Sequence, residues 1–575
     1  MMNRRLFVSG IGAAGALVVG VEKTAKGQRP VRASGVGESR FFELIRLPDR
    51  VGCWTEESGG RVSLRASAGA WDGGGVWVKA VVEGESLRIS MRAPAQALMR
   101  VQLRWTMRVA DGLSYMGDAW ERSYGELAWR TMVPERVMPW YFAAHTGAST
   151  HGYGVETGAG ALCFWQVDAE GVSLWLDVSN GGSGVLLGER ELQAARVVSR
   201  KGVGGEDAQD AITALCRKMC PKPRLPVGPV FGTNDWYYAY GKNTAEGILR
   251  DTEMMVDVSS KGKWRPFSVI DDGWRGNISV DESVHGNARF PDMGKLAKDI
   301  ANRGARSGIW IRPLEAPTGT AANLLLPVGR YRSAEAKGAA YDPTIPEAMA
   351  IVLEKMTQVV DWGYQLVKHD FSTYELMGQW GSTMGAQPTR AGWHFHDRSR
   401  TSAEILLDLY RGLRRAAGEN TVLLGCNTVA HLGAGIFEVQ RTGDDTSGRN
   451  WERTRRMGVN TLAYRLAQND TFHRVDADCV GITRAIPWKL NRQWMELLAR
   501  SGTAVFLSVE PGAIGAEERK EIADALAITA SEGLRANALD WMGETTPERW
   551  EFRGGAKTVQ RRFRWCDENG CSPFE

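Results

Sequence analysis

Carboxylate and ammonium side chains stand where short apolar segments of the chain end. Two consecutive aspartates occupy positions 271 and 272 after the apolar run 267–270, and Lys368 and Asp370 follow the run 365–367. One ionised and one protonated carboxyl group can together break a glycosidic bond, the first as nucleophile and the second as proton donor. Charged side chains of this kind also bind hydroxyl groups, so the pattern predicts a site for a polyhydroxylated ligand.

Aromatic and further polar residues recur at equivalent positions. Arg441, Asp444 and Asp445 come after a later apolar run, and Trp236 and Trp310 lie at the ends of two others. Indole rings can pack on the C–H faces of sugars, whereas a structural scaffold has no need to gather such groups at strand ends. The sequence therefore predicts one ligand site built from several segments.

The segments that must position these residues alternate regularly. Short apolar runs, each a predicted strand, occupy residues 229–232, 267–270, 308–311, 365–367, 422–425, 436–439, 479–482 and 504–509. Amphipathic stretches such as 346–362 and 402–417 lie between them and predict helical crossovers of a parallel sheet. This rhythm predicts a (β/α)8 TIM barrel, in which side chains at the carboxyl ends of the strands form the site. A doubly wound open sheet is the alternative, but the glycine-rich phosphate loop that it often carries is missing.

The chain before the barrel has a different pattern. Residues 38–220 alternate apolar and polar side chains with period two, as at 101–109 and 172–178, which predicts an antiparallel β-sandwich. A proline-rich connector, 221–229, precedes the barrel of residues 226–515. Renewed alternation within residues 516–575 predicts a small C-terminal β region.

The strand-end motifs, taken in order, resemble the α-galactosidase clan of glycoside hydrolases, families 27 and 36, also described as melibiase-like. The resemblance is carried by the segments 234–237, 270–274, 289–292, 308–310, 368–370 and 443–446. Family 36 is the more similar of the two, because the β region before the barrel resembles its N-terminal sandwich. The resemblance implies an enzyme that hydrolyses terminal α-galactosyl residues with retention of configuration and without a cofactor or metal.

The resemblance also implies a role for each site residue. Asp370 is expected as the nucleophile and Asp444 as the general acid and base. The expected substrate-binding residues are Asp271, Asp272, Lys368, Trp236, Trp274, Trp310, Cys426, Asn427 and Arg441. Among these, the indoles would wall the pocket, while Arg441 and Asn427 would contact the hydroxyl next to the anomeric carbon. Structural roles remain open for two sets, because the aspartates at 271 and 272 could cap the following segment and Trp274 and Trp310 could be core residues.

Three departures from the family pattern surround that same hydroxyl. His369 replaces an aromatic residue, the segment 426–430 replaces a glycine-rich one, and Arg441 stands one residue nearer to Asp444 than in family 27. The alternatives within this chemistry are therefore an α-N-acetylgalactosaminidase, a β-L-arabinopyranosidase and a transglycosylase. A non-catalytic carbohydrate-binding protein is an alternative of another class. A Schiff-base enzyme using Lys368 is disfavoured, since neighbouring carboxylates keep a lysine protonated.

Composition excludes some partners and predicts a compartment. The chain has 575 residues, with 71 Lys and Arg against 67 Asp and Glu, and the charges are interleaved, which argues against nucleic-acid binding. Residues 1–27 combine the pair Arg4-Arg5 with an apolar stretch and predict an export signal, of either the twin-arginine or the general secretory type. The expected location is periplasmic or extracellular, and no later stretch is apolar enough to span a membrane.

Two features could suggest a metal. The segment 394–397 reads His-Phe-His-Asp, and eight cysteines are spread over the chain. We interpret the histidine segment as a substrate-lining or lid loop, since the expected chemistry needs no metal. The cysteine spacings lack the second pair of ligands that a zinc site requires.

Overall fold

A computed structural model describes residues 41–259, 263–276, 284–331, 338–566 and 568–572. The expected export signal at residues 1–27 lies outside the described residues. Within those ranges, no helix combines the length and the hydrophobicity that crossing a membrane requires.

Thirteen antiparallel strands form the N-terminal sheet, as the period-two pattern predicts. They are β1 (Arg50–Thr55), β2 (Val62–Ser63), β3 (Arg65–Ser67), β4 (Ala70–Gly73), β5 (Val76–Glu83), β6 (Ser86–Thr106), β7 (Ser114–Gly117), β8 (Met138–Pro139), β9 (Tyr141–His145), β10 (Thr150–Val155), β11 (Leu162–Asp168), β12 (Gly171–Asp177) and β13 (Val185–Arg200). The long strand β6 joins two groups of neighbours, because its first half pairs with β5 and β13 and its second half with β1 and β12. Its side chains Val101, Leu103 and Trp105 are buried, which places the core on one face of this strand.

A curled parallel sheet of nine strands follows. Its strands are β14 (Phe231–Asn234), β15 (Phe267–Ile270), β16 (Arg306–Ile311), β19 (Leu366–His369), β20 (Val422–Gly425), β21 (Val439–Arg441), β22 (Arg474–Asp476), β23 (Val480–Ile482) and β24 (Val505–Val509). The order is β22-β21-β20-β19-β16-β15-β14-β24-β23, and an additional parallel bridge joins Asp476 of β22 to Ala504, beside β24. The two ends of the sheet therefore meet, which is the closure that a barrel requires.

The predicted strand positions need three corrections. The seventh strand consists of two pieces, since β22 pairs with β21 and β23 pairs with β24, and Asp478 between them has a left-handed φ of 81°. The first strand begins at Phe231, two residues later than predicted, because Pro229 cannot donate a ladder hydrogen bond. The sixth begins at Val439, because the amides of Ile436 and Phe437 donate instead to a carbonyl at the end of a short helix.

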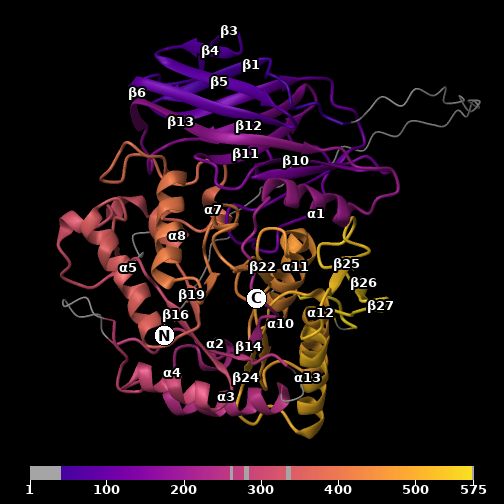
Figure 1. Cartoon of the computed structure of the whole chain (residues 1–575). Helices are drawn as coiled ribbons and strands as arrows, with labels where there is room; N and C mark the ends of the chain where they lie inside the picture. Colours follow the sequence, from indigo (N-terminus) through magenta and orange to yellow (C-terminus); the bar gives the residue numbers. More distant parts are fainter. Residues whose placement is uncertain (1–40, 260–262, 277–283, 332–337, 567, 573–575) are drawn as a thin grey trace, which may run out of the picture. The chain divides into compact units, whose positions relative to one another are not determined.

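The helices that connect these strands lie outside the parallel sheet (Figure 1). The longer ones are α3 (Ala245–Ser259), α4 (Met293–Asn302), α5 (Pro346–Asp361), α8 (Ser402–Ala417), α12 (Trp488–Ser501) and α13 (Ala516–Thr529). Short helices fill the loops: α2 (Trp236–Ala239), α6 (Ser372–Met377), α7 (Gly381–Met384), α9 (Ala430–Gly433), α10 (Trp451–Arg453), α11 (Asn460–Arg465), η1 (Ala322–Leu324), η2 (Val328–Arg330), η3 (Thr454–Val459) and η4 (Leu466–Gln468). Helix α8 shows why such a segment folds locally, since Thr401 and Glu404 form a capping box at its start.

Three smaller elements complete the fold. Helix α1 (Ala208–Met219) follows the N-terminal sheet, and β17 (Glu315–Ala316) pairs with β18 (Ala339–Ala340). At the C-terminus, β25 (Arg535–Ala538), β26 (Arg549–Gly554) and β27 (Lys557–Arg562) form a three-stranded antiparallel sheet. Cys566 and Cys571 form a disulfide, whereas the other six cysteines are buried and free.

A buried ion pair connects the N-terminal sheet region with the barrel. Arg465, in α11, lies 2.9 Å from Asp118, which follows strand β7, and both side chains are completely buried. Gln468 donates a further hydrogen bond of 3.0 Å to the same carboxylate. A buried charge is costly unless it is paired and hydrogen-bonded. Asp118 therefore needs both Arg465 and Gln468, and Arg465 needs Asp118.

Replacing Arg465 by methionine is expected to lower the free energy of unfolding by about 3–5 kcal/mol, because Asp118 then stays buried without its counter-charge. The denaturation midpoint in urea measures this loss. The control is Arg553→Met, which removes a half-exposed pair with Glu551 of 2.8 Å and should cost less than about 1 kcal/mol. Equal losses in the two variants would contradict the prediction.

Candidate active site

The carboxyl ends of neighbouring strands stand side by side in the parallel sheet. Trp310 of β16 is in register with Lys368 of β19, and His369 is in register with Gly425 of β20. Arg441 is the last residue of β21, the strand that neighbours β20. This alignment brings the predicted site segments to one edge of the sheet, where parallel barrels carry their functional residues.

Lys368 and Asp271 form a buried ion pair between strands β19 and β15. The ammonium Nζ lies 2.7 Å from Asp271 Oδ2, which also accepts a 2.7 Å hydrogen bond from the amide of Asn234. Burial alone would favour the neutral amine, but the Asp271 carboxylate outweighs it and holds the pKa of Lys368 well above its ordinary value. A permanently protonated lysine binds hydroxyl groups but is no nucleophile, which counts against the Schiff-base alternative.

Asp235 is hydrogen-bonded to the backbone of Asp271 and so helps to position this ion pair. Its Oδ1 accepts a 2.7 Å hydrogen bond from the backbone amide of Asp271, and its Oδ2 accepts one of 2.5 Å from Asn243. Burial, and then the nearby charge of Asp271, raise the pKa of Asp235 to about 7. The next residue, Asp272, is different, because 39% of its side chain is exposed and the carboxylate can meet a ligand.

Asp370 is held by two donors immediately after β19. The indole Nε1 of Trp310 donates a 3.1 Å hydrogen bond to Oδ2, and the backbone amide of Phe371 donates one of 2.7 Å to Oδ1. Phe371 has a left-handed φ of 67°, which turns its amide back onto the preceding carboxylate. The contacts fix the carboxylate orientation, as an attacking group requires.

Two consecutive carboxylates follow β21, and arginines contact both. Asp444 Oδ2 accepts a 2.6 Å hydrogen bond from Arg453, while Asp445 Oδ1 lies 3.0 Å from Arg441. Arg122 approaches both aspartates, at 3.4 Å in each case. Partial burial opposes ionisation of Asp445, but Arg441 and Arg122 outweigh it and hold the pKa of that carboxyl below its ordinary value.

Asp478 is the anchor of this loop. Its Oδ2 accepts hydrogen bonds from the guanidinium of Arg441, the hydroxyl of Tyr237, and the backbone amide and hydroxyl of Thr446, the last two at 2.7 and 2.9 Å. The side chain is almost completely buried. A buried carboxylate with four donors is firmly held. Through Tyr237 and Thr446, Asp478 therefore connects the break between β22 and β23 to α2 and to the loop that carries Asp444.

The structure buries three of the expected substrate-binding residues. Trp274 is completely buried and donates a 2.9 Å hydrogen bond to the carbonyl of Trp310, so it supports that indole and offers no face to a ligand. Asn427 is also completely buried, donates to Glu121 and accepts a 3.1 Å hydrogen bond from the amide of Tyr374. Nη2 of Arg441 contacts Asp478 and Asp445, while its buried Nε has no hydrogen-bond partner, so a hydroxyl contact by Arg441 or Asn427 stays a prediction.

The other predicted residues differ in burial. Trp236 is half-buried and follows the end of β14. Its backbone amide donates a hydrogen bond of 3.1 Å to Oδ1 of Asn234. Trp310 is buried and reaches Asp370 with its edge, while Arg275 lies 4.9 Å above its ring. Cys426 is buried among the side chains inside the parallel sheet. Trp236 thus remains the one predicted indole with a half-exposed ring among those named here.

Four residues near the site escaped the sequence analysis. Arg453 stands nine positions after Asp444 on a short helix, and Asp478 immediately precedes the predicted strand 479–482. Arg122 and Tyr124 belong to residues that were attributed wholly to the sandwich. The missing alternation over residues 118–130 was the one available signal, because it marks this segment as irregular, but it does not say where the segment goes.

The histidine segment 394–397 is tied into the fold. The amide of Phe395 donates a 2.9 Å hydrogen bond to Asn180, and His394 Nδ1 lies 2.7 Å from the carbonyl of Phe395. Asp397 accepts from Ser399 and Arg400. These contacts join the segment to the fold, and the ranges described by the structure contain no group of three side chains suited to a metal.

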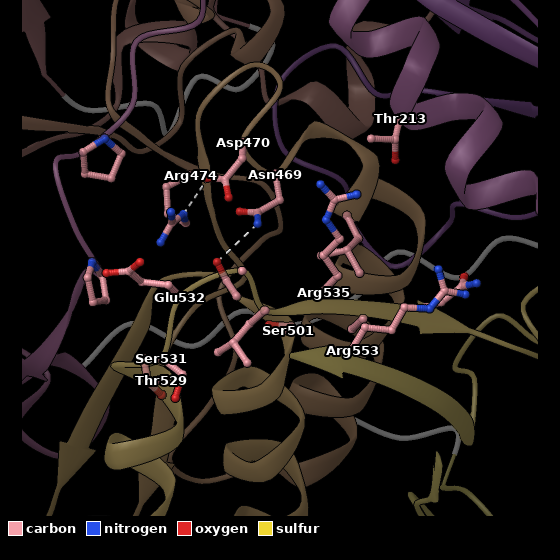
Figure 2. Close-up of a pocket in the computed structure, with 18 of the residues that line it drawn as sticks. Thr213, Asn469, Asp470, Arg474, Ser501, Thr529, Ser531, Glu532, Arg535 and Arg553 are labelled. Carbon is pink, nitrogen blue, oxygen red and sulfur yellow. Dashed lines mark hydrogen bonds and ion pairs between the residues drawn. The ribbon is translucent and has the colours of Figure 1, made fainter. Parts of the chain in front are cut away.

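A separate cavity of about 310 Å³ lies at the amino ends of the strands (Figure 2). Its walls come from α1, from the connector before β14, from the loop before β22 and from the C-terminal sheet. Its charges largely neutralise one another, as in the 2.9 Å pair between Arg474 and Asp470. The cavity shares no residue with the strand-end carboxylates, so we place the candidate active site at the opposite ends of the strands.

Replacing Asp235 by asparagine is expected to change how stability depends on pH. With a pKa near 7, folded Asp235 keeps a proton that the unfolded chain has lost between about pH 4 and 7, so stability falls as pH rises through that window. One such group contributes a slope of about 1.4 kcal/mol per pH unit. The measurement is the free energy of unfolding at several pH values from 4.5 to 7.5. We expect its decrease with pH to be smaller by this slope in Asp235→Asn than in the wild type. Identical slopes in both proteins would show that Asp235 does not titrate there.

No family model matches the chain. Its fold is similar to that of an α-galactosidase from Thermus thermophilus solved with p-nitrophenyl α-D-galactopyranoside, with 20% identity, a TM-score of 0.56, and coverage of 87% of this chain and 97% of that one. The GH36 α-galactosidase AgaA from Geobacillus stearothermophilus has 12% identity and a TM-score of 0.55, with 84% of this chain and 71% of that chain covered. An α-galactosidase from Lactobacillus brevis has 12% identity and a TM-score of 0.55, with 89% and 78% covered. The chain therefore shares the fold of α-galactosidases, and the predicted resemblance is confirmed at that level.

Proposed function

We propose that the chain is a retaining α-glycosidase, an α-galactosidase that hydrolyses terminal α-galactosyl residues of oligo- or polysaccharides. The observation that carries the proposal is the pair of oriented carboxylates, Asp370 after β19 and Asp444 after β21. One strand, β20, separates β19 from β21 in the sheet, so two strand spacings of about 4.8 Å lie between them. Side chains can span the remaining distance to a shared glycosidic bond. The similar α-galactosidases, one of them solved with a galactoside, support this choice of substrate.

The two carboxylates divide the reaction between them. Asp370, whose two oxygens each accept one hydrogen bond, attacks the anomeric carbon, while Asp444 gives a proton to the departing oxygen. A covalent glycosyl ester on Asp370 results, and Asp444 then takes a proton from the water that cleaves it. Retention of configuration follows from the two successive inversions.

The remaining polar groups would fix the sugar ring. Lys368 presents a charged donor and Asp272 an exposed acceptor, and both lie at the carboxyl ends of strands, at the same sheet edge as Asp370. Hydroxyl groups need donors and acceptors of this kind, and the half-buried ring of Trp236 offers an apolar face. The proposed substrate is therefore a neutral sugar with adjacent hydroxyl groups.

We also propose that the protein is exported to the periplasm or beyond the cell. The support is the basic and apolar pattern of residues 1–27. An extracellular or periplasmic enzyme would meet galactose-containing oligosaccharides before they are taken up.

A panel of nitrophenyl α- and β-glycosides is expected to show turnover of the α-galactoside by the wild type. Asp370→Ala should lower kcat by at least about 10⁴-fold, because no other described carboxylate replaces the nucleophile. The control is Arg535→Met at the separate cavity, which should leave kcat/KM unchanged. Turnover of the N-acetylgalactosaminide or the β-L-arabinopyranoside instead would identify the alternative specificity, and no turnover of any member would favour a non-catalytic carbohydrate-binding protein.

The stereochemistry of the first product tests the mechanism separately. Proton NMR of early hydrolysis should show α-galactose appearing before mutarotation produces the β-anomer, because two inversions restore the configuration. Initial β-galactose would mean a single displacement by water and would rule out Asp370 as nucleophile. Galactose transferred to an added alcohol or sugar, with the same α-configuration, would point to a transglycosylase.

A further inference from the structure

The segment 118–124 brings an arginine from the N-terminal sheet region to the acid side of the candidate site. The amide of Ser123 donates a 2.9 Å hydrogen bond to the carbonyl of Thr442, and the amide of Asp444 donates one of 2.8 Å to the carbonyl of Ser123. Ser123 and Gly443 thus pair as in a parallel strand, and the Ser123 hydroxyl lies 2.7 Å from that of Thr461. The segment extends the edge of the loop that carries Asp444.

Buried contacts hold this segment in place. The guanidinium of Arg465 donates a 2.6 Å hydrogen bond to the carbonyl of Glu121. The Glu121 carboxylate, itself completely buried, accepts from Asn427 and from the amide of Gly381 at 3.0 Å. The segment therefore contacts the loops that follow β19, β20 and β21, and its position is fixed from three directions.

Arg122 is aimed at the two consecutive carboxylates. Only 6% of its side chain is exposed, and its two terminal nitrogens each lie 3.4 Å from an oxygen, one on Asp444 and one on Asp445. The rings of Tyr124 and Trp380 flank the guanidinium with centroids at 5.7 and 5.5 Å. The Nε atom has no hydrogen-bond partner and lies 3.6 Å from Glu121. Packing therefore determines where the guanidinium points.

We propose that Arg122 is a positioning residue that holds the Asp444 carboxyl group in line with the departing oxygen. This inference rests on the proposed function, in which Asp444 gives that proton. Arg453 contacts Oδ2 of Asp444 from the exposed side of the loop, and Arg122 contacts Oδ1 from the buried side. Among the described residues, removing Arg122 leaves Arg453 as the side chain paired with the Asp444 carboxylate, so Oδ1 loses its partner and the carboxyl group can rotate away from the position that proton transfer needs. The 3.4 Å contacts can shorten when a substrate excludes water, as catalytic contacts in empty sites often do.

The test is a series of aryl and alkyl α-galactosides whose leaving groups differ in acidity. A poor leaving group such as methanol needs the proton, whereas 2,4-dinitrophenolate departs without it. Arg122→Met is expected to lower kcat/KM about 100-fold for methyl α-galactoside and less than about 3-fold for the dinitrophenyl substrate. Arg122→Lys, which keeps the charge, should recover part of the loss, and Asp444→Ala should show the same dependence on leaving group more strongly.

The matched control is Arg136→Met. Arg136 belongs to the same N-terminal region and donates to two backbone carbonyls, of Tyr115 at 2.9 Å and Ala128 at 3.0 Å, without touching either carboxylate. This variant should keep the wild-type ratio between the two substrates, even if its total activity falls. An equal loss for good and poor leaving groups in both Arg122→Met and Arg122→Lys would overturn the positioning role and leave the proposed function intact. A wild type that cleaves no galactoside would instead overturn the proposed function, and the inference with it.

Discussion

The buried contact between Arg441 and Asp478 is the interaction on which the acid side of the site depends. Both side chains are about 1% exposed, so neither charge can be satisfied by water. Asp478 also breaks strand seven, and its left-handed backbone turns the carboxylate toward strand six. Because Thr446 bonds to the same carboxylate, the loop of Asp444 and Asp445 is fixed at both ends. One buried charge thus couples the break in strand seven to the placement of the candidate acid, Asp444.

The residues around the candidate nucleophile, Asp370, are also held by buried polar contacts, but with different partners. Lys368 and Asp271 neutralise each other. Asn234 donates a hydrogen bond to the Asp271 carboxylate, and Asp235 accepts one from the backbone amide of Asp271. Asp370, in contrast, receives only neutral donors, from Trp310 and from a backbone amide. Neutral donors orient a carboxylate without cancelling its charge, which suits an attacking group. The two halves of the site therefore differ in the kind of partner that each carboxylate has.

The sequence predicts those features that depend on local pattern. Apolar runs and helical periodicity placed the strands β15, β16, β19 and β20 to within a residue or two, and the rule for parallel strands then placed Asp271 and Asp370 at one edge. Exposure could not be predicted in the same way. Trp274 and Asn427 carry residue types typical of a sugar site, yet tertiary packing buries both of them. The split of strand seven cannot be predicted from the sequence either, because a single residue with a positive φ does not change the periodicity of apolar residues.

Arg122 shows why a site that draws on two regions cannot be assembled from either pattern alone. The local sequence around it has no regular periodicity, and its position depends on contacts with residues more than 300 positions later, such as Asp444 and Arg465. These contacts bury polar groups of both regions, so each region leaves unpaired charges if the other is absent. The N-terminal sheet region therefore contributes directly to the surroundings of the candidate site. Its loop completes the shell around the candidate acid, and the parallel sheet without it would present Asp444 with its buried side uncovered.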